Sequence, residues 1–196
     1  MLVINDSYRI GIAVLRIGLG IIFVWAGLEK LLGPEPFSAA GFLQFGTAGS
    51  LGWPFVVGEV ADGTVFNPTQ PFWAGLATND GAMAVIDVLV PFGQLGIGIG
   101  LVLGLLTRFS AAMGTLMMLF FFVAAWDFAF GIVNQHLTYA LVTGFIGLIG
   151  AGNHFGLDGA VAASAPGWAR EWLLSGTPDD RSPLGMRPGD LSLARR

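Results

Sequence analysis

The chain has 196 residues, of which 54% are hydrophobic and only 11% are charged, and its mean hydropathy is +0.72. A soluble domain carries about 25% charged residues because its surface faces water, so this composition excludes a soluble globular protein and predicts an integral membrane protein. A net charge of −4 without any basic run argues against nucleic acid as a partner. The lack of cysteine excludes disulfides, thiol redox chemistry, iron–sulfur clusters and c-type haem.

Four stretches of the chain are long and apolar enough to cross a bilayer, which takes about 20 mostly apolar residues. The first begins near Ile10, is longer than a signal peptide and lacks an Ala-x-Ala cleavage site, so we expect it to stay in the membrane. The predicted fold class is therefore an all-α membrane protein, a four-transmembrane-helix bundle. Within a membrane domain of residues 1–158, the spans are expected at about residues 10–32, 82–106, 109–132 and 133–151.

The distribution of arginine predicts the orientation of these spans. Arg9 precedes the first span, Arg108 lies between the second and third, and the remaining arginines outside the spans follow the fourth. The long connection of residues 33–81 contains neither arginine nor lysine. Because cytoplasmic loops of membrane proteins are enriched in Lys and Arg, we expect both termini on the cytoplasmic side of the cell membrane (N-in/C-in).

The connection of residues 33–81 is too long for a simple link between helices, and it is rich in aromatic residues. We expect a structured outer cap, with short helices at Ser38–Phe45 and Pro71–Ala77. An interfacial belt of aromatic residues with no further role is the alternative interpretation.

Beyond the fourth span, Trp168 and Trp172 are four residues apart and so share one face of a helix. Residues 159–174 are therefore predicted to form a helix on the inner membrane interface. From Ser175 onward Pro, Gly, Asp and Arg dominate, which predicts a disordered cytoplasmic tail of residues 175–196.

Glycines recur at regular spacing in two of the predicted spans. Small residues at such spacing allow helix backbones to approach closely in lipid. We therefore expect the second and fourth spans to pack tightly against neighbouring helices. The glycines concerned are Gly96, Gly100 and Gly104 in the second span, and Gly144, Gly147 and Gly150 in the fourth.

Ionisable side chains inside the membrane are costly and are therefore functional candidates. Because the spans alternate in direction, we expect several of them to lie at one outer level, where they could share protons and hold a polar headgroup. Snorkelling of the charges to the interface, or structural pairing between helices, would account for them without a ligand. The residues expected at this level are Glu29, Lys30, Asp87, Asp127 and His136, with Gln94 nearer the middle of the membrane.

Arg16 is expected roughly 10 Å from the inner end of the first span. It either snorkels to the inner interface or binds Gln94, backbone carbonyls or a ligand inside the bundle. The only two histidines, His136 and His154, lie about 27 Å apart by helical rise, so they cannot both bind one haem within the chain. No cluster of residues has metal-ligand spacing, and no metal site is predicted.

Seven segments of the chain together form a recognisable pattern: Leu15–Gly20, Trp25–Leu31, Phe37–Leu43, Gly93–Leu95, Gly100–Arg108, Gln135–Ala140 and Gly150–Asp158. In these segments the chain resembles the DoxX-like membrane proteins. The resemblance covers about residues 15–158 and implies a four-helix bundle. Some members of the family are named as the membrane subunit of a thiosulfate:quinone oxidoreductase, and others are associated with redox-stress partners. Many relatives carry an acid near the position of Gln94, and its replacement by an amide here argues against proton chemistry at that position.

We therefore expect a quinone-linked membrane subunit of an oxidoreductase system, with no covalently bound cofactor. Its expected partners are the lipid bilayer, quinone, and other membrane or soluble redox subunits or a second copy of the chain. The alternative is a non-catalytic assembly or anchoring subunit, and a small-solute transporter is a weaker third hypothesis. Disulfide-forming quinone reductases are excluded because they need cysteine. The candidate ligands of the quinone headgroup are Arg16, Glu29, Lys30, Asp87, Gln94, Asp127 and His136.

Overall fold

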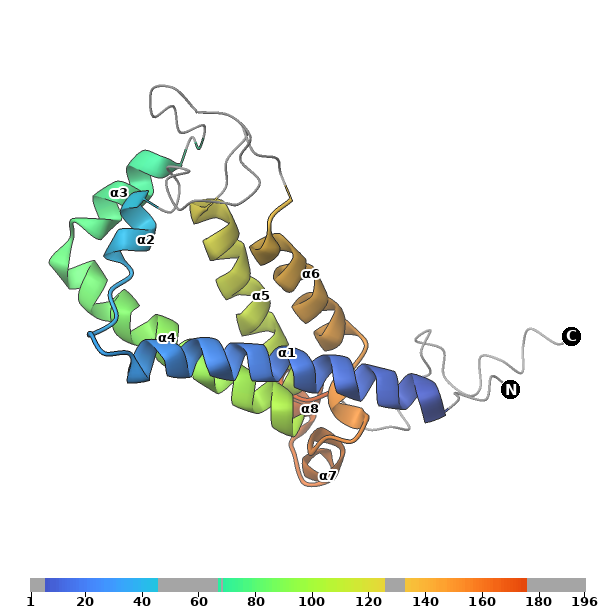
Figure 1. The fold of residues 1–196 in the computed structure, drawn as a ribbon. Coiled ribbons are helices and arrows are strands. Elements are labelled where there is room, and N and C mark those ends of the chain that lie inside the picture. The colour runs from blue at the N-terminus through green and yellow to red at the C-terminus, as the bar shows by residue number, and fades with distance from the viewer. Residues whose placement is uncertain (1–5, 46–66, 68, 126–132, 176–196) are drawn as a thin grey trace, which may run out of the picture.

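A computed structural model describes residues 6–45, 67, 69–125 and 133–175 of the chain. Within these ranges all regular structure is helical. Four long helices form the body of the molecule, and shorter helices cover its two ends (Figure 1). The elements are α1 (Asp6–Leu32), α2 (Ala40–Phe45), α3 (Gln70–Ala77), α4 (Asp80–Leu103), α5 (Thr107–Ala124), α6 (Gln135–Leu148), the 3-10 helix η1 (Ala151–Asn153), α7 (Asp158–Ala162) and α8 (Gly167–Trp172).

Three of the described helices, α1, α4 and α5, are long and apolar enough to cross a membrane. Their surfaces expose large apolar side chains to the surroundings, among them Trp25 and Leu32 of α1, which are 70% and 77% exposed. Such surfaces are expected where lipid replaces water as the solvent. The fourth predicted span corresponds to α6, which has 14 residues and so is only about 21 Å long by helical rise. The four-span count stays a prediction.

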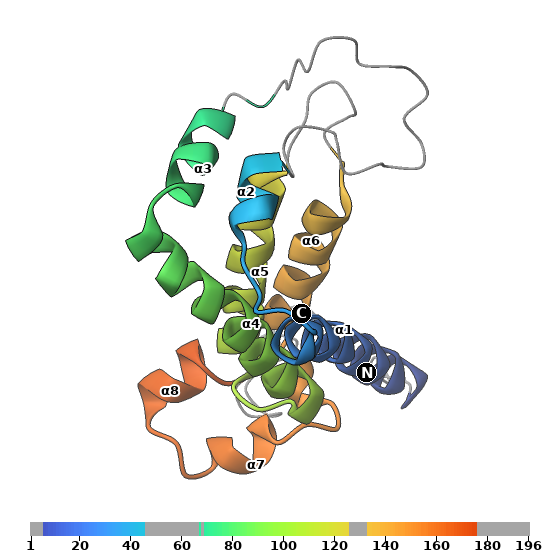
Figure 2. The same cartoon turned by 60° about the vertical axis from the view of Figure 1, so that its left-hand side comes forward.

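Helices α1 and α4 run in opposite directions and cross at close range (Figures 1 and 2). Glycines make the approach possible. A Cβ atom at Gly98 of α4 would lie 2.5 Å from the backbone nitrogen of Val24, and one at Gly27 of α1 would lie 2.8 Å from the carbonyl oxygen of Pro91. Real Cβ atoms do not come this close to backbone, so both positions exclude any larger residue.

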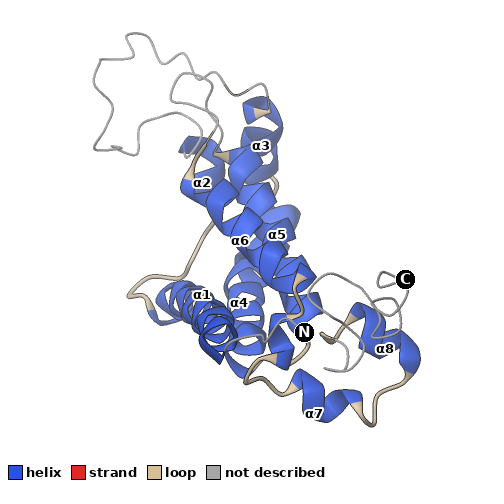
Figure 3. Ribbon diagram, turned by 90° about the vertical axis from the view of Figure 1, so that its right-hand side faces the viewer, coloured by secondary structure: helices blue, strands red, loops and turns tan. Residues whose placement is uncertain are grey.

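Helices α5 and α6 form a second antiparallel pair (Figure 3). A Cβ at Gly147 of α6 would lie 2.9 Å from that of Ala111, and one at Gly114 of α5 would lie 2.9 Å from the side chain of Thr143. Glycines therefore promote close packing of α4 through Gly98, which is outside the predicted regular spacing, and of α6 through Gly147, which belongs to it. Gly96 is different, because no atom lies within 4 Å of the position its Cβ would take.

The end of the molecule that carries α2 and α3, here called the cap end, is fastened by polar side chains. Asp87 of α4 accepts a 2.7 Å hydrogen bond from the backbone nitrogen of Ala39, directly before α2. Asn67 donates to the carbonyl oxygens of Val123 and Ala124, where α5 leaves carbonyls without helical partners. Helices α2 and α3 lie within the predicted outer cap, most of whose remaining residues are outside the described ranges.

The opposite end, here called the turn end, contains the tight turn between α4 and α5 and the helices α7 and α8 (Figure 2). Two short helices replace the single interfacial helix predicted for residues 159–174. Pro166 accounts for the break, because proline disfavours helical geometry in the residue before it, and Pro166 itself is the extended N-cap of α8. Ser175, assigned from sequence to the tail, is fully buried, and residues 176–196 lie outside the described ranges.

Candidate functional site

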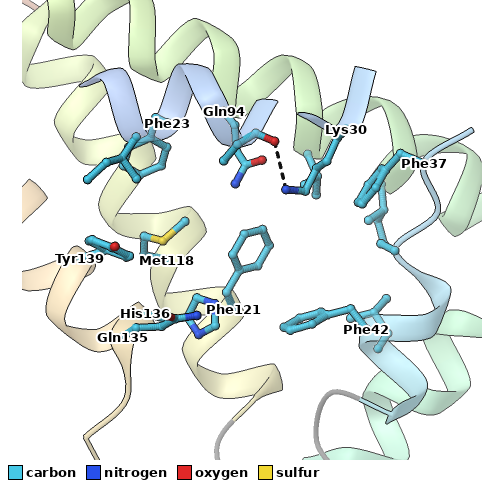
Figure 4. A pocket seen from close by; sticks show the side chains of 16 residues that line it. Phe23, Lys30, Phe37, Phe42, Gln94, Met118, Phe121, Gln135, His136 and Tyr139 are labelled. Atoms are coloured by element: carbon cyan, nitrogen blue, oxygen red, sulfur yellow. Dashed lines mark hydrogen bonds between the residues drawn. The ribbon is translucent and has the colours of Figure 1, made fainter. Parts of the chain in front are cut away.

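A cavity of about 340 Å³ lies at the cap end, between the α1–α4 pair, the α5–α6 pair and α2 (Figure 4). Most of its wall is apolar or aromatic, and polar side chains project from α1, α4 and α6. We call it the cap-end cavity. The polar residues that line it are Lys30, Gln94, Gln135, His136 and Tyr139, and the aromatic ones are Phe23, Phe37, Phe42 and Phe121.

Lys30 and Gln94 form one side of the cap-end cavity in Figure 4. The Lys30 ammonium donates a 3.1 Å hydrogen bond to the carbonyl oxygen of Ala26 and lies 5.6 Å from the centre of the Phe37 ring. Among the described residues the ammonium makes no other hydrogen bond, so two of its three N–H donors are open to a ligand there. Gln94 is only 4% exposed, yet its side-chain oxygen Oε1 has no hydrogen-bond partner in the described structure.

His136 lies on the opposite side of the cavity, at the start of α6 (Figure 4). The rings of Phe42 and Phe121 meet its imidazole edge-on, with centroid distances of 6.3 and 5.8 Å. Its Nδ1 atom is buried and has no hydrogen-bond partner in the described part of the chain. Two buried polar atoms without partners among the described residues, Gln94 Oε1 on α4 and His136 Nδ1 on α6, therefore belong to residues that line this largely aromatic cavity.

Tyr139 and Gln135 also line the cavity and were not among the sequence-predicted site residues. A sequence signal for them exists, because Gln135 and Tyr139 are four residues apart and so lie on one helical face. That face also borders His136, which was predicted. The aromatic residues Phe37 and Phe42 come from the segment that the sequence assigns to the outer cap.

Two other residues predicted for the outer level, Glu29 and Asp87, do not line the cavity. Glu29 is exposed, because it is adjacent to Lys30 and consecutive side chains point about 100° apart on a helix. Asp87 is engaged by the backbone of Ala39 at the start of α2. Asp127 lies outside the described residues. The structure thus brings Lys30, Gln94 and His136 together out of the predicted set.

A second, larger hollow of about 810 Å³ runs between α4 and α5 and is almost entirely apolar. We call it the α4–α5 groove. It extends from Phe72 and Trp73 of α3 to Leu106 and Phe109 at the turn end. The groove and the cap-end cavity have five lining residues in common: Phe42, Leu43, Ile86, Val90 and Phe121.

Arg16 lies at the turn end and does not line the cap-end cavity. Its side chain is fully buried and donates hydrogen bonds to the carbonyl oxygens of Ala151, at 3.1 Å, and Phe155, at 3.2 Å. Backbone carbonyls are among the partners that the sequence analysis leaves open for it. Gly104 and Gly156 make room for the guanidinium, because a Cβ at either position would overlap it.

Asp158 completes a polar cluster at the turn end, and sequence reasoning missed it. Its carboxylate is fully buried and accepts hydrogen bonds from the backbone nitrogens of Thr107, at 3.2 Å, and Ser175, at 3.0 Å. It also attracts Arg16 electrostatically. The residue lies beyond the last predicted span, where neither hydropathy nor helical periodicity marks it. This cluster ties α1, the α4–α5 turn and the segment after α6 together.

His154 lies beside this cluster, with its ring edge-on to Tyr8 at 6.2 Å between centroids. Burial lowers the pKa of His154, and the positive charges of Arg9 and Arg16 lower it further. Protonation of this histidine is therefore disfavoured. Among the residues that the structure describes, no group of three His, Asp or Glu side chains is placed to hold a metal ion.

Comparison with known proteins gives one family match. The DoxX family matches residues 11–129, which include most of α1 and all of α4 and α5, and therefore both Lys30 and Gln94. The α6 residues His136 and Tyr139 lie beyond the matched range. No curated protein matches the chain, and no solved structure matches it.

Proposed function

Because the chain belongs to the DoxX family, we propose that it is a quinone-linked membrane subunit of an oxidoreductase system and that it binds the quinone headgroup in the cap-end cavity. Some members of the family that the sequence resembles are the membrane subunit of a thiosulfate:quinone oxidoreductase, which suggests the ligand class. The cavity supplies a site whose size and lining suit such a ligand. The proposed location is a multi-pass position in the cell membrane.

The observation that carries the proposal is the buried side-chain oxygen Oε1 of Gln94, which has no hydrogen-bond partner among the described residues. Leaving a buried polar group without a hydrogen-bond partner costs about 1–3 kcal/mol, so a ligand that supplies the partner is favoured there. Gln94 Oε1 can accept a hydrogen bond from a quinol hydroxyl. Rotation of the amide would present its NH2 group to a quinone carbonyl instead.

His136 suits the other end of the same ring, and Lys30 lies beside Gln94 at the first end. A quinone is a flat apolar ring with oxygen atoms at opposite positions, and polar groups on opposite sides of the cavity match this pattern (Figure 4). His136 can accept or donate a hydrogen bond according to its tautomer, and Lys30 has N–H groups to donate. The aromatic residues Phe37, Phe42 and Phe121 would cover the faces of the ring.

Reduction of a quinone to a quinol consumes two electrons and two protons. In this proposal the His136 imidazole gives one proton to one ligand oxygen, the Lys30 ammonium gives the second proton to the other oxygen, and Gln94 orients the ring. The chain has no cysteine, and its sequence contains no recognised binding motif for a redox cofactor. The electrons would therefore come from a bound substrate or from another subunit.

The test is to measure quinone bound to the purified full-length protein. We expect lipid extracts of the wild-type protein to contain quinone, and Gln94→Leu to weaken quinone binding about tenfold, as expected for the loss of one buried hydrogen bond. His136→Phe should weaken binding similarly, whereas His154→Phe, which changes the histidine at the turn end, should not.

Equal quinone binding in the wild-type, Gln94→Leu and His136→Phe proteins would contradict the proposed site. Absence of quinone together with stable co-purification of other membrane subunits would support the alternative, an assembly or anchoring role.

A further inference from the structure

We infer that the α4–α5 groove holds the polyisoprenoid tail of the quinone. This inference rests on the proposed function, because it assigns the tail of the ligand whose headgroup occupies the cap-end cavity. It adds a binding subsite and a requirement for a long apolar chain.

Continuity between the two hollows is the first argument. Their common lining residues include Phe42 of α2, Val90 of α4 and Phe121 of α5. A ligand in the cap-end cavity therefore borders the groove directly. A tail attached to the headgroup would pass these side chains and continue along an apolar surface without crossing a polar one.

The dimensions of the groove are the second argument. Its α4 wall extends from Ile86 to Leu103, which corresponds to about 25 Å at 1.5 Å per residue. This approaches the hydrocarbon thickness of a bilayer, about 30 Å. A tail in the groove would thus lie at the depth where it already resides in the membrane.

Glycine is the third argument. On the groove wall, Gly96 is exposed and has no atom within 4 Å of its would-be Cβ, and Gly93 would meet only the flexible end of Met117. These two glycines therefore hold no helix in place by close backbone contact, in contrast to Gly98 on the α1 side. Their effect is to keep the groove wide along α4.

A helix of a second copy is the other apolar occupant that would fit between α4 and α5. It would cover the groove, but it would leave Gln94 Oε1 and His136 Nδ1 without partners in the adjoining cavity. A molecule with a polar head and an apolar tail would fill the groove and would also supply hydrogen-bond partners in the cavity. We therefore favour the tail.

The experiment places a bulky side chain in the groove without disturbing the protein. Gly96→Phe adds a ring where the structure has free space, and Gly18→Phe is the matched control on α1, since Gly18 is also exposed with no atom within 4 Å. Each full-length protein is placed in lipid nanodiscs. Binding is then measured for a benzoquinone with a long polyisoprenoid tail and for the same headgroup without a tail.

We expect Gly96→Phe to weaken binding of the long-tailed quinone by about tenfold or more, a difference easily resolved in a binding constant. Binding of the tail-less headgroup should not change, which also shows that the variant is folded. Gly18→Phe should bind both compounds as the wild-type protein does.

If Gly96→Phe affects both compounds equally or neither, the tail assignment is wrong while the headgroup site stands. If the wild-type protein binds neither compound, the proposed function fails and the tail assignment fails with it. A change in oligomeric state in Gly96→Phe, with long-tail binding intact, would identify a second copy as the occupant and overturn the inference.

Discussion

For Arg16, the sequence predicts that the guanidinium has a compensating partner but does not identify that partner. A guanidinium at that depth costs about 2.5–3.5 kcal/mol on insertion scales, so a compensating partner could be predicted. Which partner it has could not be predicted, because the two carbonyls that bind it lie 135 and 139 positions further along the chain. Only the folded arrangement brings the segment after α6 back to α1.

The first prediction is that Arg16→Lys destabilises the protein while leaving the cap-end cavity intact. Lysine carries a point charge and lacks the planar fork that reaches both carbonyl oxygens. Loss of one hydrogen bond from a charged group corresponds to about 1.5–3 kcal/mol. Thermal and denaturant unfolding in detergent would measure the loss. Quinone binding should be unchanged, since Arg16 does not line the cavity.

Arg9→Lys is the matched control for this prediction. Arg9 is exposed, and its guanidinium lies 5.7 Å from the centre of the Phe155 ring, an arrangement that a lysine ammonium can reproduce in part. We expect little change in stability. If Arg16→Lys were as stable as the wild-type protein but lost quinone, Arg16 would be a quinone ligand, as the sequence analysis allows, and the structural role would be rejected.

At the scale of helices, hydropathy predicts where the long helices lie but not where they end. Helices α1, α4 and α5 fall within or close to the predicted spans, because a bilayer demands uninterrupted apolar segments. The predicted third span reaches residue 132; α5 ends at Ala124, and residues 126–132 lie outside the described ranges. The residues after it are still apolar, so hydropathy alone contains no stop signal there.

The second prediction concerns the α1–α4 contact and separates packing glycines from groove glycines. Gly98→Ala should destabilise the protein by about 1–3 kcal/mol, the range for overpacking, because its Cβ would lie 2.5 and 2.7 Å from the backbone atoms Val24 N and Gly20 O. Unfolding in detergent would measure this, and crosslinking between α1 and α4 would report any separation of the helices.

Gly96→Ala is the control, two residues away on the same helix. Its Cβ meets no atom within 4 Å, and alanine in a helix is favoured over glycine by about 0.5–1 kcal/mol. We therefore expect unchanged or slightly higher stability. Equal destabilisation by both substitutions would show that α4 packs against a partner along its whole length, contrary to the structure.

For the molecule as a whole, the alternating direction of the helices decides which residues share the cap-end cavity. It brings Lys30 of α1, Gln94 of α4 and His136 of α6 to one cavity, although Lys30 and His136 are more than 100 positions apart in the sequence. Depth along a helix does not specify which way a side chain points, which is why Glu29 was grouped with Lys30. The contribution of α2 was also hidden, because aromatic residues fit an interfacial belt and a cavity wall equally well.

The last prediction is the membrane topology, which decides between three and four spans. Helix α6 is shorter than a typical span, and with three spans the two termini would lie on opposite sides of the membrane. Arginine at the turn end and after α6, but none in residues 33–81, favours four spans with both termini cytoplasmic. A reporter fused after Arg196 should therefore be cytoplasmic, and one inserted between Asp62 and Thr64 should be external.

An external reporter after Arg196, with the loop reporter still external, would establish three spans and leave α6 within the membrane without crossing it. A cytoplasmic loop reporter would invert the orientation, and the cap-end cavity would then face the cytoplasm.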